Sequence, residues 1–277
     1  MLRGFLACSD RSPRGELRVN KTLIGGLTLA LVGLALGLYL EGGRIGQVLQ
    51  PTAAVIVFGG TLGAVMVQFP LPVLKDAVRH LRHILGDNAD PAPRLIQQLR
   101  DYAAEALRNG LVSLDSELGQ IHDPFLRKAM TYAVDGVSPA DLRRRMEVEM
   151  DIEAEREAAI PRVFESAGGF APTIGILGAV LGLIQVMQRL ENIEQVGKGI
   201  AVAFVATLYG VGLANLLLLP CAGRIKLLMR RRQILRELIV DGVVSIVERT
   251  GPINMEMKLA AYRETAASTQ SRKLVTL

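Results

Sequence analysis

The chain has 277 residues and a formal net charge of +5; 50% of the residues are hydrophobic, 4% are aromatic and none is Trp. Its charged residues, 21% of the total, are absent from four stretches, here named spans one to four, at residues 23–40, 52–74, 167–187 and 199–221. Each span is close to the ~20 residues with which an α-helix crosses a ~30 Å hydrocarbon core. The pattern excludes a soluble enzyme and predicts an all-α membrane protein with four transmembrane helices in two hairpins.

Basic residues are distributed unequally between the segments that join the spans. The short loops at residues 41–51 and 188–198 contain three of the 32 Lys and Arg residues. The others lie in three longer segments, residues 1–22, 75–166 and 222–277. Because cytoplasmic segments of membrane proteins carry the excess of Lys and Arg, both termini and the central segment are predicted to be cytoplasmic.

Residues 1–22 form the first segment and lack the apolar stretch of roughly 7–15 residues that a signal peptide requires. We expect a cytoplasmic N-terminal tail. Cys8 lies in this tail and Cys221 at the inner end of span four. A disulfide is not expected between two cysteines on the reducing side of the membrane.

Residues 75–166 separate the two hairpins and are rich in charge. Apolar residues recur in this segment at helical spacing, as at Leu95, Leu99 and Tyr102. Asn109-Gly110 separates two such helices, and Ser138-Pro139 combines an N-cap residue with a proline at the first helical position. The segment is predicted to be a cytoplasmic helical domain.

Residues 222–277 begin with a basic cluster beside span four, which comprises Arg224, Lys226, Arg230, Arg231, Arg232 and Arg236. A cluster next to the bilayer is typical of contact with anionic headgroups. Nucleic-acid binding is disfavoured, because no aromatic residues are interleaved for base stacking. We predict a cytoplasmic C-terminal helix followed by a polar tail.

The sequence offers little for catalysis. Of the three histidines, only His80 and His83 could share a helix face, and a metal site needs more ligands than that. Neither a phosphate-binding glycine loop nor a Ser-His-acid signature is present. We therefore expect no enzyme activity, no catalytic residue, no metal and no cofactor.

The spans are rich in glycine but contain no carboxylate, imidazole or amine. Small residues three or four apart, as at Gly175, Gly178 and Gly182, let membrane helices approach closely and favour a packed oligomer. Proton relays through membranes use Asp, Glu or His. Either this chain conducts no protons, or another subunit supplies the carboxylate.

Several motifs together resemble one family. They are residues 170–178 (FAPTIGILG), residues 206–210 (ATLYG), Pro220 and residues 238–246 (LIVDGVVSI). This combination is similar to the A subunit of the flagellar motor stator, the MotA/PomA type of the MotA/TolQ/ExbB proton channel family, over about residues 23–263. The resemblance implies an ion-driven, torque-generating homopentamer in the bacterial inner membrane. It also implies a ring around two copies of a B-type subunit, which has a single span with an ion-binding Asp and a peptidoglycan-binding domain.

The resemblance also assigns an ion pathway. Thr207 occupies the family's threonine in span four and is expected to face the partner's Asp, and Pro172 and Pro220 match the family's two membrane prolines. These prolines could instead serve only as helix kinks and ends. Ala179 stands where sodium-driven members carry threonine. Because a methyl group offers no oxygen to a dehydrated Na⁺, the transported ion is predicted to be H⁺.

A rotor-contact segment is the last feature that the resemblance implies. Residues 108–115 (RNGLVSLD) look like the family segment that touches the rotor switch protein of the flagellar C-ring through opposite charges. The candidates are Arg108, Asp115 and Glu117. The family's paired basic residues are reduced here to Arg108, and its glutamate is replaced by Asp115. These charges could also simply solvate a helix.

Two other functions remain open at this point. One is a TolQ/ExbB-like energiser of another envelope process, such as gliding or outer-membrane transport. Those energisers resemble a three-span plan, whereas this chain has four apolar stretches and a long insert. The other is a passive four-helix membrane scaffold. Purification with a single-span partner that carries a membrane Asp would support the stator or the energiser and would exclude the scaffold.

Overall fold

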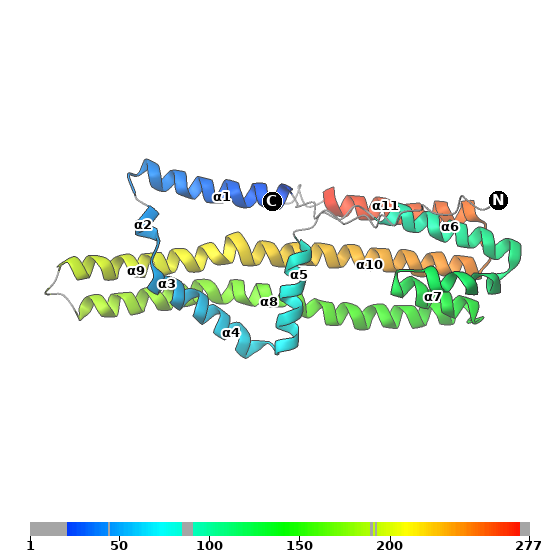
Figure 1. Ribbon diagram of the computed structural model, residues 1–277, viewed down its shortest axis with the longest axis horizontal. Helices are drawn as coiled ribbons and strands as arrows, with labels where there is room; N and C mark the ends of the chain where they lie inside the picture. Colours follow the sequence, from blue (N-terminus) through cyan, green and yellow to red (C-terminus); the bar gives the residue numbers. More distant parts are fainter. Residues whose placement is uncertain (1–20, 44, 85–90, 189–190, 192, 272–277) are drawn as a thin grey trace, which may run out of the picture.

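The computed structural model describes residues 21–43, 45–84, 91–188, 191 and 193–271. These residues form helices joined by turns, with no strand among them, as the all-α prediction required. The molecule is an elongated rod (Figure 1). The predicted N-terminal tail lies, up to residue 20, outside the described part of the chain.

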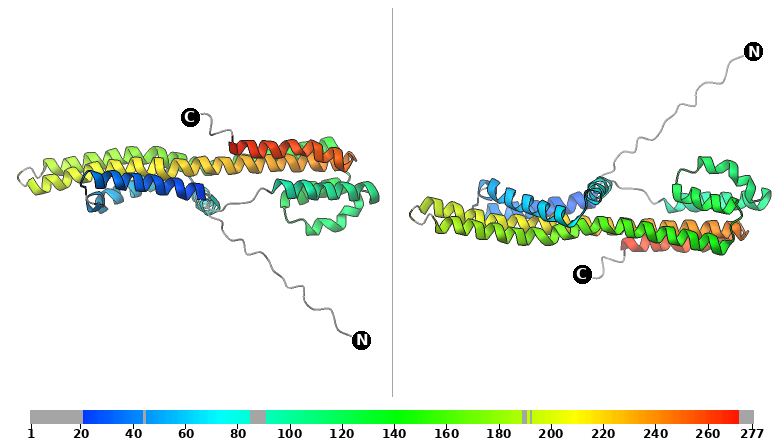
Figure 2. Two further views of the ribbon diagram at one scale, coloured as in Figure 1. Left: turned by 90° about the horizontal axis from the view of Figure 1, so that it is seen from above. Right: turned by 90° about the horizontal axis from the view of Figure 1, so that it is seen from below.

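Two long antiparallel helices run the length of the rod (Figures 1 and 2). One is α8 (Pro139–Met187), and the other is the continuous run of α9 (Ile193–Gly212), the π-helical η3 (Leu213–Leu218) and α10 (Leu219–Val247). At 1.5 Å per residue, the 49 residues of α8 extend about 70 Å. The helix passes from the predicted cytoplasmic domain into span three without a break at residues 166–167.

The start of α8 confirms its predicted cap. The Ser138 hydroxyl accepts a hydrogen bond from the Asp141 backbone N–H at 3.2 Å, and Pro139 occupies the first helical position. Pro161 and Pro172, in contrast, lie inside the helix. Both are at least half-buried, so packing against neighbouring helices holds α8 together where an isolated helix would kink.

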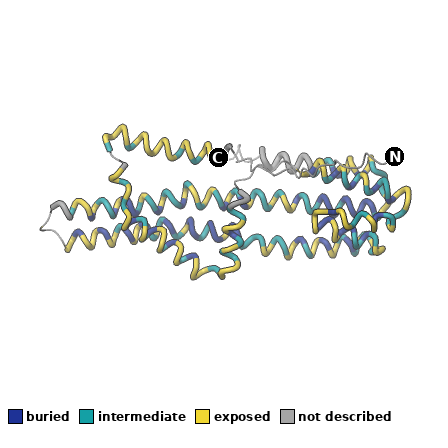
Figure 3. Tube along the Cα trace, viewed as in Figure 1, coloured by how far each residue is buried: buried dark blue, intermediate teal, exposed yellow. Residues whose placement is uncertain are grey.

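The apolar end of the rod also carries α1 (Lys21–Leu40), α2 (Ile45–Val48), α3 (Pro51–Ala54), the π-helical η1 (Val55–Gly59) and α4 (Gly60–Gln68). Three helical runs are long and apolar enough to cross a membrane: Pro51–Gln68 and segments of Pro139–Met187 and Val196–Val247. Ile24–Leu40 is a shorter apolar helix. Most described side chains of α1 are exposed (Figure 3), in contrast to the buried stripe along α8 and α9.

The apolar helix of span two ends at Gln68, and the chain then turns. Phe69 is extended and Pro70 follows, so residues 71–74 belong to α5 (Leu71–Ile84). This helix runs across the rod (Figure 1). It packs against α8 and α10 where the apolar end of the rod meets the charged end.

The charged end is a helical domain built around the tips of α8 and α10. Its other elements are α6 (Ala92–Asn109), the 3₁₀ helix η2 (Leu111–Gln120), α7 (Pro124–Val134) and α11 (Pro252–Ser271). Leu99, Leu126, Met146 and Leu238 are fully or almost fully buried in its core. Gly110, with φ +85°, makes the predicted break after Asn109, because a side chain is strained in that conformation.

Candidate functional site

The centre of the candidate site is the crossing of α8 and α9, where glycines bring two backbones together. A Cβ atom on Gly175 would lie 2.8 Å from the Ala206 carbonyl oxygen, and one on Gly210 would overlap the carbonyl oxygen of Ala171. Gly182 approaches the Gly199 carbonyl oxygen in the same way, at 3.1 Å. The spaced glycines, which predicted close packing of membrane helices, therefore lie at the contact between α8 and α9.

Thr207 lies directly at this crossing. Its Cα would be 3.3 Å from a Cβ on Gly175, and its hydroxyl donates to the Ala203 carbonyl at 3.4 Å. Pro172 and Ala179 lie on the turns of α8 before and after Gly175 and share one flank of the helix, because seven residues make two turns. Helical periodicity therefore places Pro172 and Ala179 about one turn to either side of the contact between Gly175 and Thr207.

Pro220 is not part of this group. It is the second residue of α10 and is exposed, and the neighbouring Leu219 packs against Gly168, about one turn beyond Pro172. Pro220 closely follows the π-helical η3 within the continuous run of α9, η3 and α10. Its place in the ion pathway stays a prediction.

Span two covers the other flank of the α8–α9 pair. Ile56 packs against Gly178, and Ile174 packs against Gly60. Figure 2 shows α1 and the α3–α4 segment on one side of this pair. At 100° per residue, Ile174 and Gly178 lie on the opposite flank of α8 from Pro172 and Ala179. Among the described residues, span two therefore leaves free the flank that carries Thr207, Ala179 and Pro172, whose side chains are themselves partly buried.

The surroundings of Thr207 on this flank are apolar. Ile176 is 56% exposed, Leu183 50% and Val211 45%. Charged side chains do not occur in spans three and four. Exposed apolar side chains with one hydroxyl among them suit a lipid or helix neighbour, and they cannot themselves hold or release a proton at neutral pH.

Tyr209, known from the sequence only as part of the ATLYG motif, makes contacts with the segment before span two. Its hydroxyl donates to the Val48 carbonyl at 2.7 Å and accepts a hydrogen bond from the Gln50 N–H at 3.4 Å. Its ring also packs near Phe58 of span two. Tyr209 thus ties the loop after α1 to α9, two residues from Thr207; its place in the ATLYG motif was the only signal in the sequence.

The rotor-contact candidates lie where α6 ends and η2 follows it, and Figure 1 shows that α6 ends at the tip of the helical domain. Arg108 is exposed at the end of α6, Asp115 is exposed on η2, and Glu117 is partly exposed on the same element. The left-handed turn at Gly110 places the two elements side by side. Both signs of charge are therefore available to a partner at the end farthest from the apolar helices.

A polar cluster that sequence reasoning did not find joins α8, α10 and α11. The Asp241 carboxylate accepts hydrogen bonds from the Arg143 guanidinium and the Tyr262 hydroxyl, and its side chain is only 13% exposed. Lys258 of α11 donates to the buried Ser245 hydroxyl at 3.3 Å. The only signal in the sequence was the place of Asp241 within the family-like residues 238–246.

Electrostatics in this cluster favour the ionised carboxylate. Burial favours the neutral form of Asp241, but hydrogen bonds from Tyr262 and Arg143 outweigh it, so the pKa of the carboxyl lies below its usual value. Burial and the hydrogen bond to Asp241 raise the pKa of the Tyr262 phenol. The cluster is therefore an ion pair with a neutral tyrosine across three helices.

Metal-ligating groups are sparse. Within the described residues, no group of three or more His, Cys, Asp and Glu side chains is arranged to hold a metal ion. The His80 ring Nδ1 lies 2.9 Å from the Asp76 carbonyl oxygen, and His122 is exposed before α7.

Comparison with known proteins gives the same assignment across both halves of the chain. Residues 24–99 match the motility protein A N-terminal family, and residues 117–237 match the MotA/TolQ/ExbB proton channel family. Motility protein A of Bacillus subtilis (strain 168) is 34% identical over 245 residues, which are 88% of this chain and 91% of that protein.

Two solved structures share the fold. One is the flagellar MotAB stator complex from Bacillus subtilis, with a TM-score of 0.81 and 34% identity over 88% of this chain and 96% of the matched chain. The other is C. jejuni MotAB, with a TM-score of 0.82 and 29% identity over 87% and 94% of the two chains. With its apolar helices, its helical domain and this similarity over most of both lengths, the chain belongs to the motility protein A family of flagellar stator subunits.

Proposed function

We propose that this chain is a torque-generating stator subunit of the bacterial flagellar motor and crosses the inner membrane four times as two hairpins. Both termini and the helical domain lie in the cytoplasm. Five copies form a ring around a B-type subunit whose single span carries the ion-binding Asp. The observation that carries the proposal is the apolar flank with Thr207, Ala179 and Pro172 that span two leaves free, which lacks any titratable group and so requires a partner's carboxylate.

The mechanism follows from the cost of a charge beside that flank. An ionised carboxylate within the membrane is unfavourable by at least about 2.5 kcal/mol, whereas the protonated carboxyl is neutral. The Thr207 hydroxyl, the polar group at the crossing, can hydrogen-bond either form. Proton binding and release therefore alternate between two preferred positions of the partner against the ring, and this bias turns the ring in steps.

Similarity to the motility protein A N-terminal family over residues 24–99 supports the stator over the TolQ/ExbB-like energiser. In this proposal the chain converts an ion gradient into rotation and catalyses no group transfer.

Replacing Thr207 with Val tests the site directly. The change keeps the shape of the side chain and removes its hydroxyl, so swimming is expected to fall at least tenfold while the complex still assembles, since Thr207 is only half-buried. Swimming speed and co-purification of the partner subunit measure the two effects.

Thr207→Ser should keep most of the speed. The matched control is Thr173→Val, because Thr173 is exposed on another flank of α8 and its hydroxyl donates to the Phe170 carbonyl of the same helix. Equal speeds for Thr207→Val and Thr173→Val would refute a role for the Thr207 hydroxyl.

Ala179 leads to a prediction about the driving ion. Its methyl group gives no oxygen ligand beside the crossing, so rotation should follow the proton gradient. A protonophore is expected to stop tethered cells, and replacing Na⁺ with K⁺ should leave their speed unchanged. Rotation that stops on Na⁺ removal but survives the protonophore would contradict proton drive.

Charge reversal tests the proposed contact with the rotor switch protein. Arg108→Asp combined with Asp115→Arg should reduce torque severalfold, because rim charges set the register and on-rate of such contacts. Stator assembly should be unchanged, because both side chains are exposed. Bead assays of torque and membrane localisation measure the two effects, and unimpaired torque would discard these residues as the contact.

A further inference from the structure

Each of the four sides of α5 has different surroundings. One side packs against the protein core. Val73, Leu74, Ala77 and Leu81 pack against α8 and α10 in one apolar cluster. This contact fixes the rotation of α5 about its own axis. Since the helix crosses the rod (Figure 1), its two flanks must face the apolar end and the charged end.

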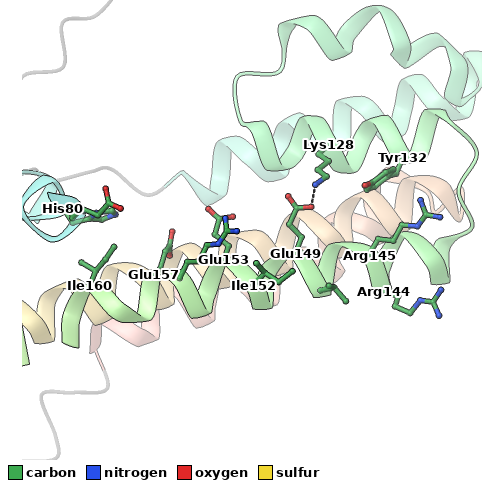
Figure 4. Close-up of a pocket in the computed structure, with 13 residues that line it drawn as sticks. His80, Lys128, Tyr132, Arg144, Arg145, Glu149, Ile152, Glu153, Glu157 and Ile160 are labelled. Atoms are coloured by element: carbon green, nitrogen blue, oxygen red, sulfur yellow. Dashed lines mark hydrogen bonds and ion pairs between the residues drawn. The ribbon is translucent and has the colours of Figure 1, made fainter. Parts of the chain in front are cut away.

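The flank towards the charged end is polar. Asp76 and His80 line a groove of about 800 Å³ between α5, α7 and α8. Figure 4 shows His80 at one end of this groove and Tyr132 of α7 at the other, with the Lys128–Glu149 ion pair between them. Asp76 and His80 therefore point towards the helical domain.

The flank towards the apolar end is hydrophobic and exposed. At 100° per residue, Leu71 and Val78 lie opposite Asp76 and His80. Leu71 is 60% exposed and Val78 59%. Removing this exposed apolar surface from water is favourable. Their exposure towards the membrane-crossing end suits contact with lipid.

The outer side of α5, opposite the core contact, is basic. Lys75 is exposed, and the Arg79 side chain is 71% exposed. Arg79 pairs with Asp76 at 3.1 Å, a surface ion pair of the kind that contributes little to stability and can exchange for another anion. Basic side chains between an apolar and a polar flank are typical of helices that lie in the headgroup layer.

We propose that Lys75 and Arg79 form a binding site for the phosphate of an anionic phospholipid, whose acyl chains contact Leu71 and Val78. This inference rests on the proposed orientation, which puts the helical domain in the cytoplasm and α5 in the inner leaflet. Because α5 is packed on both long helices, a bound headgroup fixes the depth at which the α8–α10 pair crosses the bilayer.

The test uses the full chain purified in detergent and titrated with phosphatidylglycerol or with phosphatidylcholine of the same acyl chains. Native mass spectrometry counts the retained lipids, and the unfolding temperature reports binding. Phosphatidylglycerol is expected to bind more tightly. Lys75→Gln and Arg79→Gln should each weaken it about fivefold, and together about 30-fold, without changing phosphatidylcholine binding.

Three controls separate the alternatives. Arg108→Gln removes a distant exposed charge and should leave the lipid preference intact. Val78→Ser should weaken the binding of both lipids. Inorganic phosphate at the same concentrations should not raise the unfolding temperature. Equal binding of the two lipids by the unmodified chain, or a preference that survives the double variant, would overturn the proposal. Since the assay does not involve motility, a chain that drives no flagellum but keeps the preference would refute only the proposed function.

Discussion

Gly210→Ala is expected to prevent α8 and α9 from closing on each other. The new methyl group would overlap the Ala171 carbonyl oxygen and lie 3.1 Å from the Gly175 Cα, and both obstacles are backbone atoms that no rotamer change can move. Overpacking of this kind costs roughly 3 kcal/mol or more when two backbones must separate. The unfolding temperature of the purified protein and its level in the membrane should both fall sharply.

Gly212→Ala is the matched control, because a Cβ on Gly212 meets no atom within 4 Å. It lies only two residues from Gly210, and alanine is the better helix former by about 1 kcal/mol. The control should therefore be neutral or stabilising. If the two variants unfolded alike, the close approach of α8 and α9 would not be what the glycine provides. Swimming should follow stability in this pair, since Thr207 depends on the same crossing.

Asp241→Asn is expected to loosen the helical domain. The asparagine carbonyl can still accept from Tyr262 but leaves the Arg143 guanidinium with only the longer ion pair to Glu147, at 3.9 Å, among the described residues. Hydrogen bonds to charged groups contribute about 1.5–3 kcal/mol each. The loss should therefore be about 2–3 kcal/mol. Because the lost contact joins α8 to α10, proteolysis of the helical domain should be faster in the variant.

The same contacts predict a pH dependence. Since the pKa of Asp241 is lower in the folded protein than its ordinary value near about 4, its stabilising contribution is complete above that ordinary value. The contribution is lost as the pH falls through the lowered folded-state pKa. The unmodified protein should therefore lose more stability than the Asn variant between about pH 5 and pH 2, so that the gap between their unfolding temperatures narrows.

Asp151→Asn serves as the control for both measurements, because Asp151 is an exposed carboxylate on α8 and its loss should change stability by no more than about 0.5 kcal/mol. Tyr262→Phe removes one donor and should cost about 1 kcal/mol. Were Asp241→Asn indistinguishable from Asp151→Asn, the cluster would not hold the three helices together.

Local sequence patterns determined the elements of this protein. Uncharged stretches predicted the apolar helices. Ser138-Pro139 predicted the start of α8, and Asn109-Gly110 predicted the break between α6 and η2. These features depend on a few neighbouring residues and their backbone conformation, and on the length of an apolar stretch relative to the thickness of the bilayer. The lack of a carboxylate in the spans, which points to a partner subunit, was likewise fully contained in the sequence.

The tertiary structure decided how those elements are joined and which side chains meet. Pro161 and Pro172 stay inside one helix because neighbouring helices hold it, and α5 turns across the rod because its apolar side fits both α8 and α10. Thr207 meets the flank of Pro172 and Ala179 only because distant glycines allow two backbones to touch. The Asp241 cluster joins residues far apart in the chain, and such contacts depend on packing between helices that no local pattern specifies.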